Sequence, residues 1–343
     1  MVDDARGGMA AHLEVKRQVF AQHQKSAPLE MRAPLAAFMG EPPPAPGWFQ
    51  RAIAAEPERG VVATPRGRIE TLSWGEVGRP GLLLAHGLTA HADWWSFICP
   101  MFADDYRVTA MSLAGMGDSD WREQYSFEGF AADAEAVCRA TGLDAGGRKP
   151  VYIGHSFGGG NVFSVASRRP EQLHSAIIID VGFSGPAKAP PAQEAGAPQD
   201  APKKGTIKVY PSLVEALARF RLSPLQPVTH PYIVDYIARR SLKRVPLPDG
   251  SGEGWSWKFD PDMWAKFDRP PLDAFFASSP QVDVPIAHIR GEFSLLRSIP
   301  GLNDAYPANG LAIDIPDAHH HVMLDQPLAL TAAIRSLLAA WRA

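Results

Sequence analysis

The stretch VYIGHSFGGGNVF, residues 151–163, decides which fold the chain adopts. A short apolar run leads into Ser156 and apolar residues return after it at helical spacing, which is typical of a strand, a tight turn and a helix. Gly154 and Gly158 stand two residues before and two residues after the serine, where a sharp strand-to-helix turn requires small residues. The stretch alone predicts either an exposed nucleophilic serine or a glycine-rich turn with an incidental serine.

Strand and helix patterns alternate on both sides of this stretch. Apolar runs typical of buried strands occur at 81–87, 106–115, 175–180, 284–292 and 310–317, and residues 67–76 alternate like an antiparallel strand. Helical spacing is found at 126–143, 158–169 and 327–343. This alternation predicts an α/β fold, in which helices cover a parallel sheet.

Composition shifts divide the chain into four segments. Residues 1–59 are expected to form an N-terminal extension, and residues 60–184 and 279–343 carry the strand–helix pattern of a core. Residues 185–278 interrupt that pattern, and we expect an insert with a flexible, Pro/Ala-rich start followed by a largely helical part. The sequence does not decide whether the extension packs on the core or serves a partner.

Composition and charge exclude several classes of function. The chain has 343 residues with a net charge of −3, so it lacks the basic character of a nucleic-acid binder, and it has no apolar run long enough to span a membrane. Cys99 and Cys138 are far apart and have no metal-type spacing. The acidic N-terminus lacks the apolar segment of a signal peptide. We expect a soluble cytoplasmic protein without a disulfide framework, and a homo-oligomer stays open.

A catalytic serine needs two backbone N–H groups that stabilise the developing oxyanion. One is expected from Phe157, directly after the serine, and the other from the loop that follows the strand at 81–87. In that loop Leu88 follows a His–Gly pair and is our candidate for the second N–H. Because a His–Gly pair is by itself an ordinary turn, this candidate depends on the wider pattern.

Four motifs make the chain resemble the α/β-hydrolase superfamily from residue 60 onward. They are HGLTAHADWW, GMGDSD, GHSFGG and HHVMLDQP, and they occur in the order that the superfamily uses. The resemblance implies a mostly parallel eight-stranded sheet with helices on both faces and an inserted cap, and it says little about the substrate. The sequence departs from relatives at Ser112 and Met116, where they often carry Asp and His.

The base is expected among three adjacent histidines, His319, His320 and His321. The resemblance implies a histidine five residues before an acidic residue that is followed by one residue and a proline. Asp325 and Pro327 set this register at His320. A metal site is the alternative, but three adjacent residues do not easily turn toward one ion, so we expect no metal.

The acid that orients the base has two candidates. Many relatives place an aspartate three residues past a glycine that follows the seventh strand, but Ser294 stands at that position here. Resemblance to dehalogenases of the superfamily, such as the fluoroacetate type, implies instead the aspartate at the end of the sixth strand. That residue is Asp180, which we predict as the acid, with Glu292 as the alternative.

A serine nucleophile suits acyl transfer to water, and it implies no cofactor. We expect cleavage of a carboxylic ester, lactone or thioester, with a small-molecule substrate of apolar character. The alternatives are a carbon–carbon bond (diketone) hydrolase, a perhydrolase or haloperoxidase, and a binding protein with negligible turnover. Several aromatic residues either line an apolar pocket or belong to local hydrophobic cores: Trp94, Trp95, Trp255, Trp257, Phe259 and Trp264.

Overall fold

The structure is a computed structural model that describes residues 15, 18–182, 205–268, 282–299 and 309–342. The Pro/Ala-rich start of the expected insert and the first part of the N-terminal extension lie outside the described residues.

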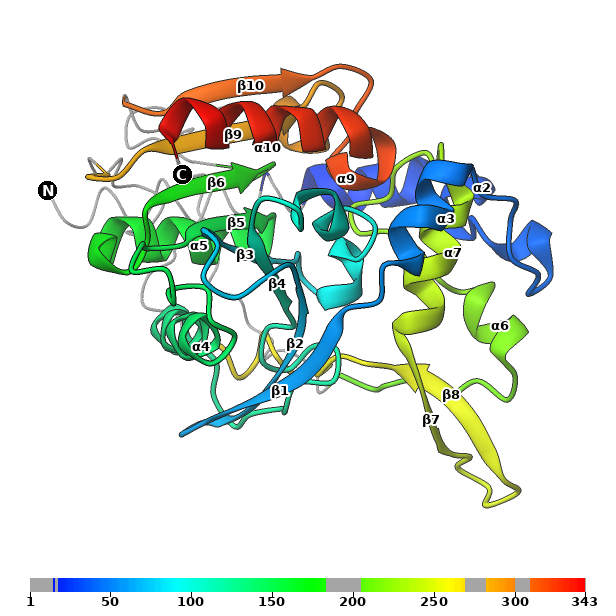
Figure 1. Ribbon diagram of the computed structural model, residues 1–343. Helices are drawn as coiled ribbons and strands as arrows, with labels where there is room; N and C mark the ends of the chain where they lie inside the picture. Colours follow the sequence, from blue (N-terminus) through cyan, green and yellow to red (C-terminus); the bar gives the residue numbers. More distant parts are fainter. Residues whose placement is uncertain (1–14, 16–17, 183–204, 269–281, 300–308, 343) are drawn as a thin grey trace, which may run out of the picture.

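An eight-stranded sheet lies at the centre of the molecule, in the order β1-β2-β4-β3-β5-β6-β9-β10 (Figure 1). Only β2 runs antiparallel to its neighbours, and the other pairs are parallel. The expectation of a mostly parallel eight-stranded sheet is therefore confirmed. The strands are β1 Glu58–Thr64, β2 Gly67–Trp74, β3 Gly81–Ala85, β4 Arg107–Met111, β5 Val151–His155, β6 Ser175–Ile179, β9 Ile286–Gly291 and β10 Leu311–Ile315.

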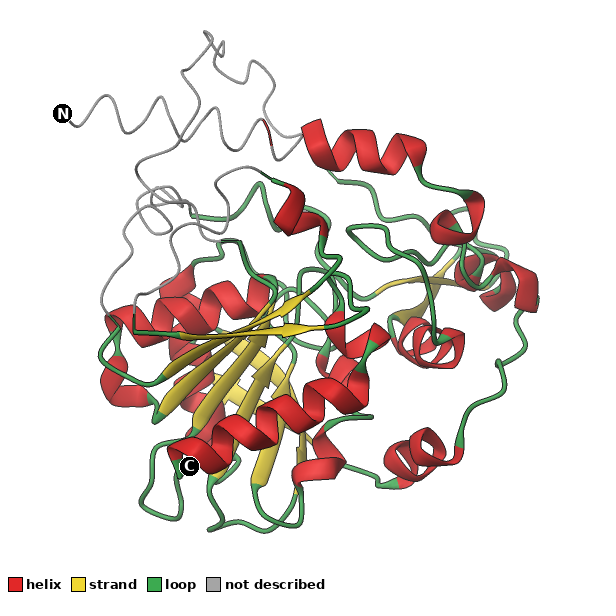
Figure 2. Cartoon of the chain, turned by 90° about the horizontal axis from the view of Figure 1, so that it is seen from above, coloured by secondary structure: helices red, strands yellow, loops and turns green. Residues whose placement is uncertain are grey.

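Helices cover both faces of the sheet (Figure 2). Along β5, Val151 and Ile153 pack into one hydrophobic cluster while Tyr152 packs into the other, as the two-residue period of a strand requires. The cluster around Tyr152 is covered by α4 (Phe127–Ala140) and α5 (Phe157–Arg168). The opposite cluster is covered by α10 (Pro327–Trp341), α9 (Val322–Asp325) and the 3-10 turns η2 (Ala92–Trp95) and η3 (Cys99–Phe102).

The part of the N-terminal extension that the structure describes packs on the core. It contains α2 (Leu29–Arg32), η1 (Ala36–Phe38) and α3 (Gly47–Ala54). Phe49 of α3 is buried, and its ring centroid lies 5.8 Å from that of Phe97 and 4.9 Å from that of Tyr232. The extension thus fills part of the main hydrophobic cluster. Its last two residues begin β1, a strand that we did not predict.

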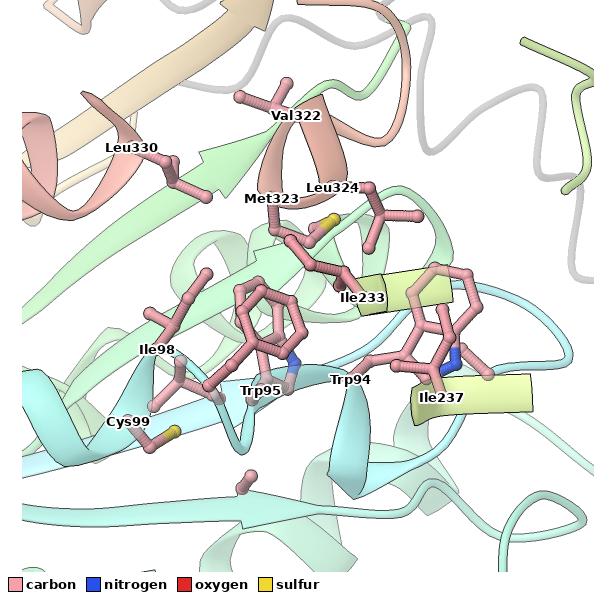
Figure 3. Packing of buried hydrophobic residues seen from close by; sticks show 14 of the residues in the cluster. Trp94, Trp95, Ile98, Cys99, Ile233, Ile237, Val322, Met323, Leu324 and Leu330 are labelled. Atoms are coloured by element: carbon pink, nitrogen blue, oxygen red, sulfur yellow. The ribbon is translucent and has the colours of Figure 1, made fainter. Parts of the chain in front are cut away.

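The described residues between β6 and β9, chiefly 205–268, form two helices and a hairpin. The helices are α6 (Leu213–Leu217) and α7 (Pro231–Arg240), and the antiparallel strands are β7 (Leu242–Pro246) and β8 (Glu253–Trp257). We expected a largely helical segment and missed the hairpin, because prolines at its turn side obscured the Asp249–Gly250 turn signal. Figure 3 shows side chains of α7, of η2 and of α9 meeting in one cluster.

No helix in the described ranges combines the length and the apolar character that crossing a bilayer requires. Cys99 and Cys138 are both buried and unpaired, in line with the expectation that no disulfide joins them.

Replacement of Phe49 by alanine tests whether α3 belongs to the core. Loss of a buried phenylalanine leaves a cavity, so we expect the free energy of unfolding in urea to fall by about 3–5 kcal/mol. The matched control is Leu29→Ala on α2, whose side chain is 75% exposed; its effect should stay within about 0.5 kcal/mol. Equal effects of the two substitutions would mean that α3 contributes nothing to the core.

Candidate active site

Ser156 lies at the sharp turn between β5 and α5. Its backbone has a φ of 52° and a ψ of −117°, which residues other than glycine seldom adopt. A Cβ atom on Gly158 would lie 2.4 Å from the carbonyl oxygen of His86, and one on Gly154 would lie 2.4 Å from that of Gly158. Both glycines are therefore required by close backbone approach, and the turn leaves Ser156 half-buried at the carboxyl end of the sheet.

Two hydrogen bonds link Ser156 to His320 and Asp180. The Nε2 atom of His320 lies 3.0 Å from Ser156 Oγ, and its Nδ1 atom lies 2.7 Å from Asp180 Oδ2. His320 is 4% exposed and Asp180 is 2% exposed. In this arrangement the hydroxyl donates to one ring nitrogen while the other donates to the carboxylate, which is the geometry that general-base activation of a serine requires.

Asp180 directly follows β6, and its backbone φ is 48°. Its carboxylate accepts further hydrogen bonds from the Ser294 hydroxyl and from the Gly291 N–H. Burial alone would raise the pKa of this carboxyl, but the hydrogen bond and attraction from His320, with those from Ser294 and Gly291, outweigh burial and hold the pKa below its ordinary value. Asp180 therefore faces His320 as a carboxylate.

The alternative acid, Glu292, is exposed, and its carboxylate accepts the N–H of Asp317 at 3.0 Å. The structure brings Asp180 to His320 and leaves Glu292 away from it. Ser294 stands where many relatives carry an aspartate, and here it supports Asp180 through its hydroxyl. Sequence reasoning set Ser294 aside because it carries no charge, and so missed its contact with the acid.

The two expected oxyanion-hole residues lie on either side of the serine turn. Phe157 is the first residue of α5, and Leu88 follows Gly87, where an added Cβ would lie 3.5 Å from Ser156 Cβ. Within the described part of the chain, the backbone N–H groups of Leu88 and Phe157 have no hydrogen-bond acceptor. Both groups are thus free to bind an oxygen atom beside Ser156 Oγ.

The two positions that depart from relatives hold the loop of Leu88 in place. The Ser112 hydroxyl accepts the N–H of Ala92 at 2.9 Å and donates to the buried Glu70 carboxylate at 2.6 Å. The thioether of Met116 accepts the N–H of Thr89 at 3.2 Å. Ser112 and Met116 therefore both contact the loop of Leu88, which the sequence did not show.

Polar contacts also fix the backbone on both sides of His320. The Asp325 carboxylate accepts a hydrogen bond from the backbone N–H of His319 at 2.7 Å, and it lies 3.1 Å from Nδ1 of the His319 ring. The side-chain oxygen of Gln226 accepts the N–H of His321 at 2.8 Å, and its amide donates to Asp325 at 3.0 Å. Gln226 is buried and comes from the segment between β6 and β9, where no motif singled it out.

The base, His320, belongs to a cluster of three buried histidines. The rings of His155, His320 and His321 are buried, and each offers a ligand atom within 4.8 Å of the others. We considered a metal site of His319, His320 and His321, but His319 instead bonds to Asp325. His155 stands directly before Ser156 in the sequence, and no sequence pattern grouped it with His319–His321.

The aromatic residues of the insert divide into two groups. Trp257 lies 5.9 Å from Tyr210 and 6.0 Å from Phe220 between ring centroids, so it packs within its own segment. Trp264 is 39% exposed, and its ring lies 5.7 Å from that of Phe157, beside the candidate nucleophile. Trp264 thus adds an apolar ring next to Phe157, the residue after Ser156.

The remaining aromatic candidates follow the same division. Trp255 stacks under the guanidinium of Arg244 on the hairpin, and Phe259 packs against the cluster that contains Met116. Trp95 is fully buried in the main cluster, whereas the ring of Trp94 lies 5.4 Å from that of His321.

Comparison with known proteins gives one family and several partial relatives. Residues 80–276 match the sequence profile of the family described as alpha/beta hydrolase fold. Epoxide hydrolase 4 of Mus musculus is 32% identical over 116 residues, which cover 33% of this chain and 31% of that protein. Lipase LipV of Mycobacterium tuberculosis is 31% identical over 108 residues, which cover 31% of this chain and 39% of that protein.

The matched stretch thus spans only about a third of the length of these curated relatives. Among solved structures, a thioesterase domain from the curacin biosynthetic pathway superimposes with a TM-score of 0.65 at 20% identity. The superposition covers 81% of this chain and 99% of that domain, which is a likeness of fold.

The buried histidines make the stability of the protein depend on pH. Burial is the largest cause that lowers the pKa of His86 and His155 to about 3, of His91 and His288 to about 4, and of His321 well below its ordinary range. An unfolded histidine has a pKa near ~6.5, so below that pH the unfolded chain binds protons that the folded chain does not. Each of these histidines then costs up to about 1.4 kcal/mol of stability per pH unit.

We therefore expect the free energy of unfolding in urea to fall steeply between about pH 6.5 and pH 5. Glu70, whose pKa burial raises, acts in the opposite sense but is one group against five. A stability that stays level over this interval would mean that these histidines are not held neutral in the folded protein.

Proposed function

Because the chain belongs to the alpha/beta hydrolase fold family, we propose that it is a serine hydrolase that cleaves a carboxylic ester, lactone or thioester. The observation that carries the proposal is the chain of hydrogen bonds from Ser156 through His320 to Asp180. Relatives of the chain include proteins named as a lipase and as epoxide hydrolases. The residue at the nucleophile position decides between such chemistries.

A serine at this position favours acyl transfer over epoxide opening. Attack by Ser156 on an epoxide carbon would leave an ether on the enzyme, which water does not hydrolyse readily. Attack on a carbonyl carbon leaves an acyl ester, which a histidine-activated water does hydrolyse. The lipase name of one relative fits the second chemistry.

The residues have the following proposed roles. Ser156 Oγ attacks the carbonyl carbon while His320 Nε2 takes its proton, and Asp180 stabilises the imidazolium. The N–H groups of Leu88 and Phe157 hold the oxyanion. His320 then gives its proton to the leaving alcohol or thiol, takes a proton from an attacking water, and returns it to Ser156 as the acid is released.

We propose that residues 185–278 form a cap over this site, next to a core made of residues 60–184 and 279–343. Two contacts support this: Trp264 packs against Phe157, and Gln226 holds the N–H of His321. The aromatic rings beside Ser156 favour an acyl group of apolar character and moderate size.

Labelling with a fluorophosphonate tests the nucleophile. We expect stoichiometric labelling of the full-length protein and none of Ser156→Ala, because the probe reacts only with an activated serine. The matched control is Ser167→Ala on the same helix, whose hydroxyl bonds to the Phe163 carbonyl; it should label like the unchanged protein. Absence of labelling in folded unchanged protein would contradict the proposal, and product analysis on ester and diketone substrates separates the two hydrolase chemistries.

The acid is tested by a pair of isosteric substitutions. Asp180→Asn removes the charge that holds the tautomer of His320, so we expect kcat for ester hydrolysis to fall by about 10⁴-fold. Glu292→Gln is the control, and its effect should stay near about twofold, as for exposed substitutions worth less than ~0.5 kcal/mol. Thermal melts of both variants establish that they are folded. The reverse order of effects would move the acid to Glu292.

A further inference from the structure

We propose that His155, His320 and His321 form a binding site for one divalent transition-metal ion of the zinc class. We propose further that this ion switches the enzyme off by occupying the nitrogen that serves as the base. Binding itself follows from the three side chains, whereas the inhibition rests on the proposed function.

The three rings form a compact triangle. Their centroids are 4.8 Å apart for His155 and His320, 5.3 Å for His155 and His321, and 4.9 Å for His320 and His321. Ligand nitrogens of the three residues lie within 4.8 Å of one another. Bonds of about 2.0–2.1 Å to a tetrahedral ion place nitrogens roughly 3.4 Å apart, so binding requires the rings to turn until their ligand nitrogens lie closer together.

Two of the rings already have the outer contacts that metal-binding histidines use. His320 directs Nδ1 to the Asp180 carboxylate at 2.7 Å, and His155 directs Nε2 to the His320 carbonyl at 2.9 Å. A histidine that donates one N–H to a carboxylate or carbonyl presents the lone pair of its other nitrogen to a metal ion. These contacts leave His320 Nε2 and His155 Nδ1 as the ligand atoms.

Unpaired polar atoms identify the same place. Both ring nitrogens of His321 and the Nδ1 atom of His155 are buried, and none of them has a hydrogen-bond partner among the described residues. A buried polar atom without a partner destabilises the folded protein, and a bound ion would give a partner to nitrogens of two rings at once.

The ligand set selects the class of ion. Three neutral imidazoles suit Zn²⁺ or Cu²⁺, whereas Mg²⁺ and Ca²⁺ require oxygen ligands. Ser156 Oγ lies 3.0 Å from His320 Nε2 and is close enough to serve as a fourth ligand. The Asp180 carboxylate, bonded to the other nitrogen of His320, offsets part of the positive charge of the ion. With His320 Nε2 bound to the ion, no base remains to take the proton of Ser156.

Calorimetric titration of the full-length protein with Zn²⁺ tests the site independently of catalysis. We expect one ion per chain, and His321→Gln should weaken its affinity by at least about tenfold, because even outer-shell substitutions cost 10–100-fold. The matched control is His174→Gln, which changes a histidine directly before β6, at the end of that strand opposite the site, and should leave the affinity for Zn²⁺ unchanged. No binding by the unchanged protein, or equal affinity in His321→Gln, would overturn the proposal.

Fluorophosphonate labelling of Ser156 with and without Zn²⁺ tests whether the bound ion inhibits the enzyme. We expect Zn²⁺ to block labelling, EDTA to restore it, and His321→Gln to need at least about tenfold more Zn²⁺ for the same block. Binding without loss of labelling would overturn the inhibition and keep the site. A protein that binds Zn²⁺ but never labels, even with EDTA, would instead contradict the serine-hydrolase proposal.

Discussion

The hydrogen bond between Asp180 and His320 is the interaction on which the arrangement of the site depends. It joins the end of β6 to the loop after β10. The same carboxylate accepts hydrogen bonds from the N–H of Gly291, the last residue of β9, and from the hydroxyl of Ser294, which follows that strand. A buried carboxylate is costly unless such donors surround it. Three separate stretches of chain must therefore meet at Asp180, and their meeting places the free nitrogen of His320 at Ser156.

A second constraint is steric and acts at the serine. The strained backbone of Ser156 persists because β5 and α5 hold the turn from both sides, and glycines allow those backbones to approach. The histidine loop is held from a different direction, since Gln226 and Asp325 fix the N–H groups on either side of His320. The segment that carries Gln226 therefore contacts the backbone of the residue next to the base.

Much of the fold followed from local patterns. The apolar runs of the fully buried strands, the glycines around Ser156 and the apolar faces of the helices are properties of neighbouring residues, so the sequence predicts them. β1 and the β7–β8 hairpin were missed, because exposed charges in the first and prolines in the second weaken the alternation. Asp180 was predicted from the resemblance to dehalogenases. The roles of Ser294 and Gln226 and the grouping of His155 with His321 arise instead from contacts between distant segments, which no local pattern encodes.

The tautomer of His320 is the most direct test of the hydrogen-bonded arrangement of Ser156, His320 and Asp180. Proton and nitrogen NMR of the full-length protein with ¹⁵N-labelled histidine identifies which ring nitrogen carries the proton and how strongly that proton is hydrogen-bonded. From the hydrogen bond to Asp180 we predict a strongly deshielded proton on Nδ1 of His320. Its resonance should move upfield when the Asp180 carboxylate is replaced by an amide. A proton on Nε2, or an Nδ1 resonance that does not respond to the residue at position 180, would contradict this arrangement.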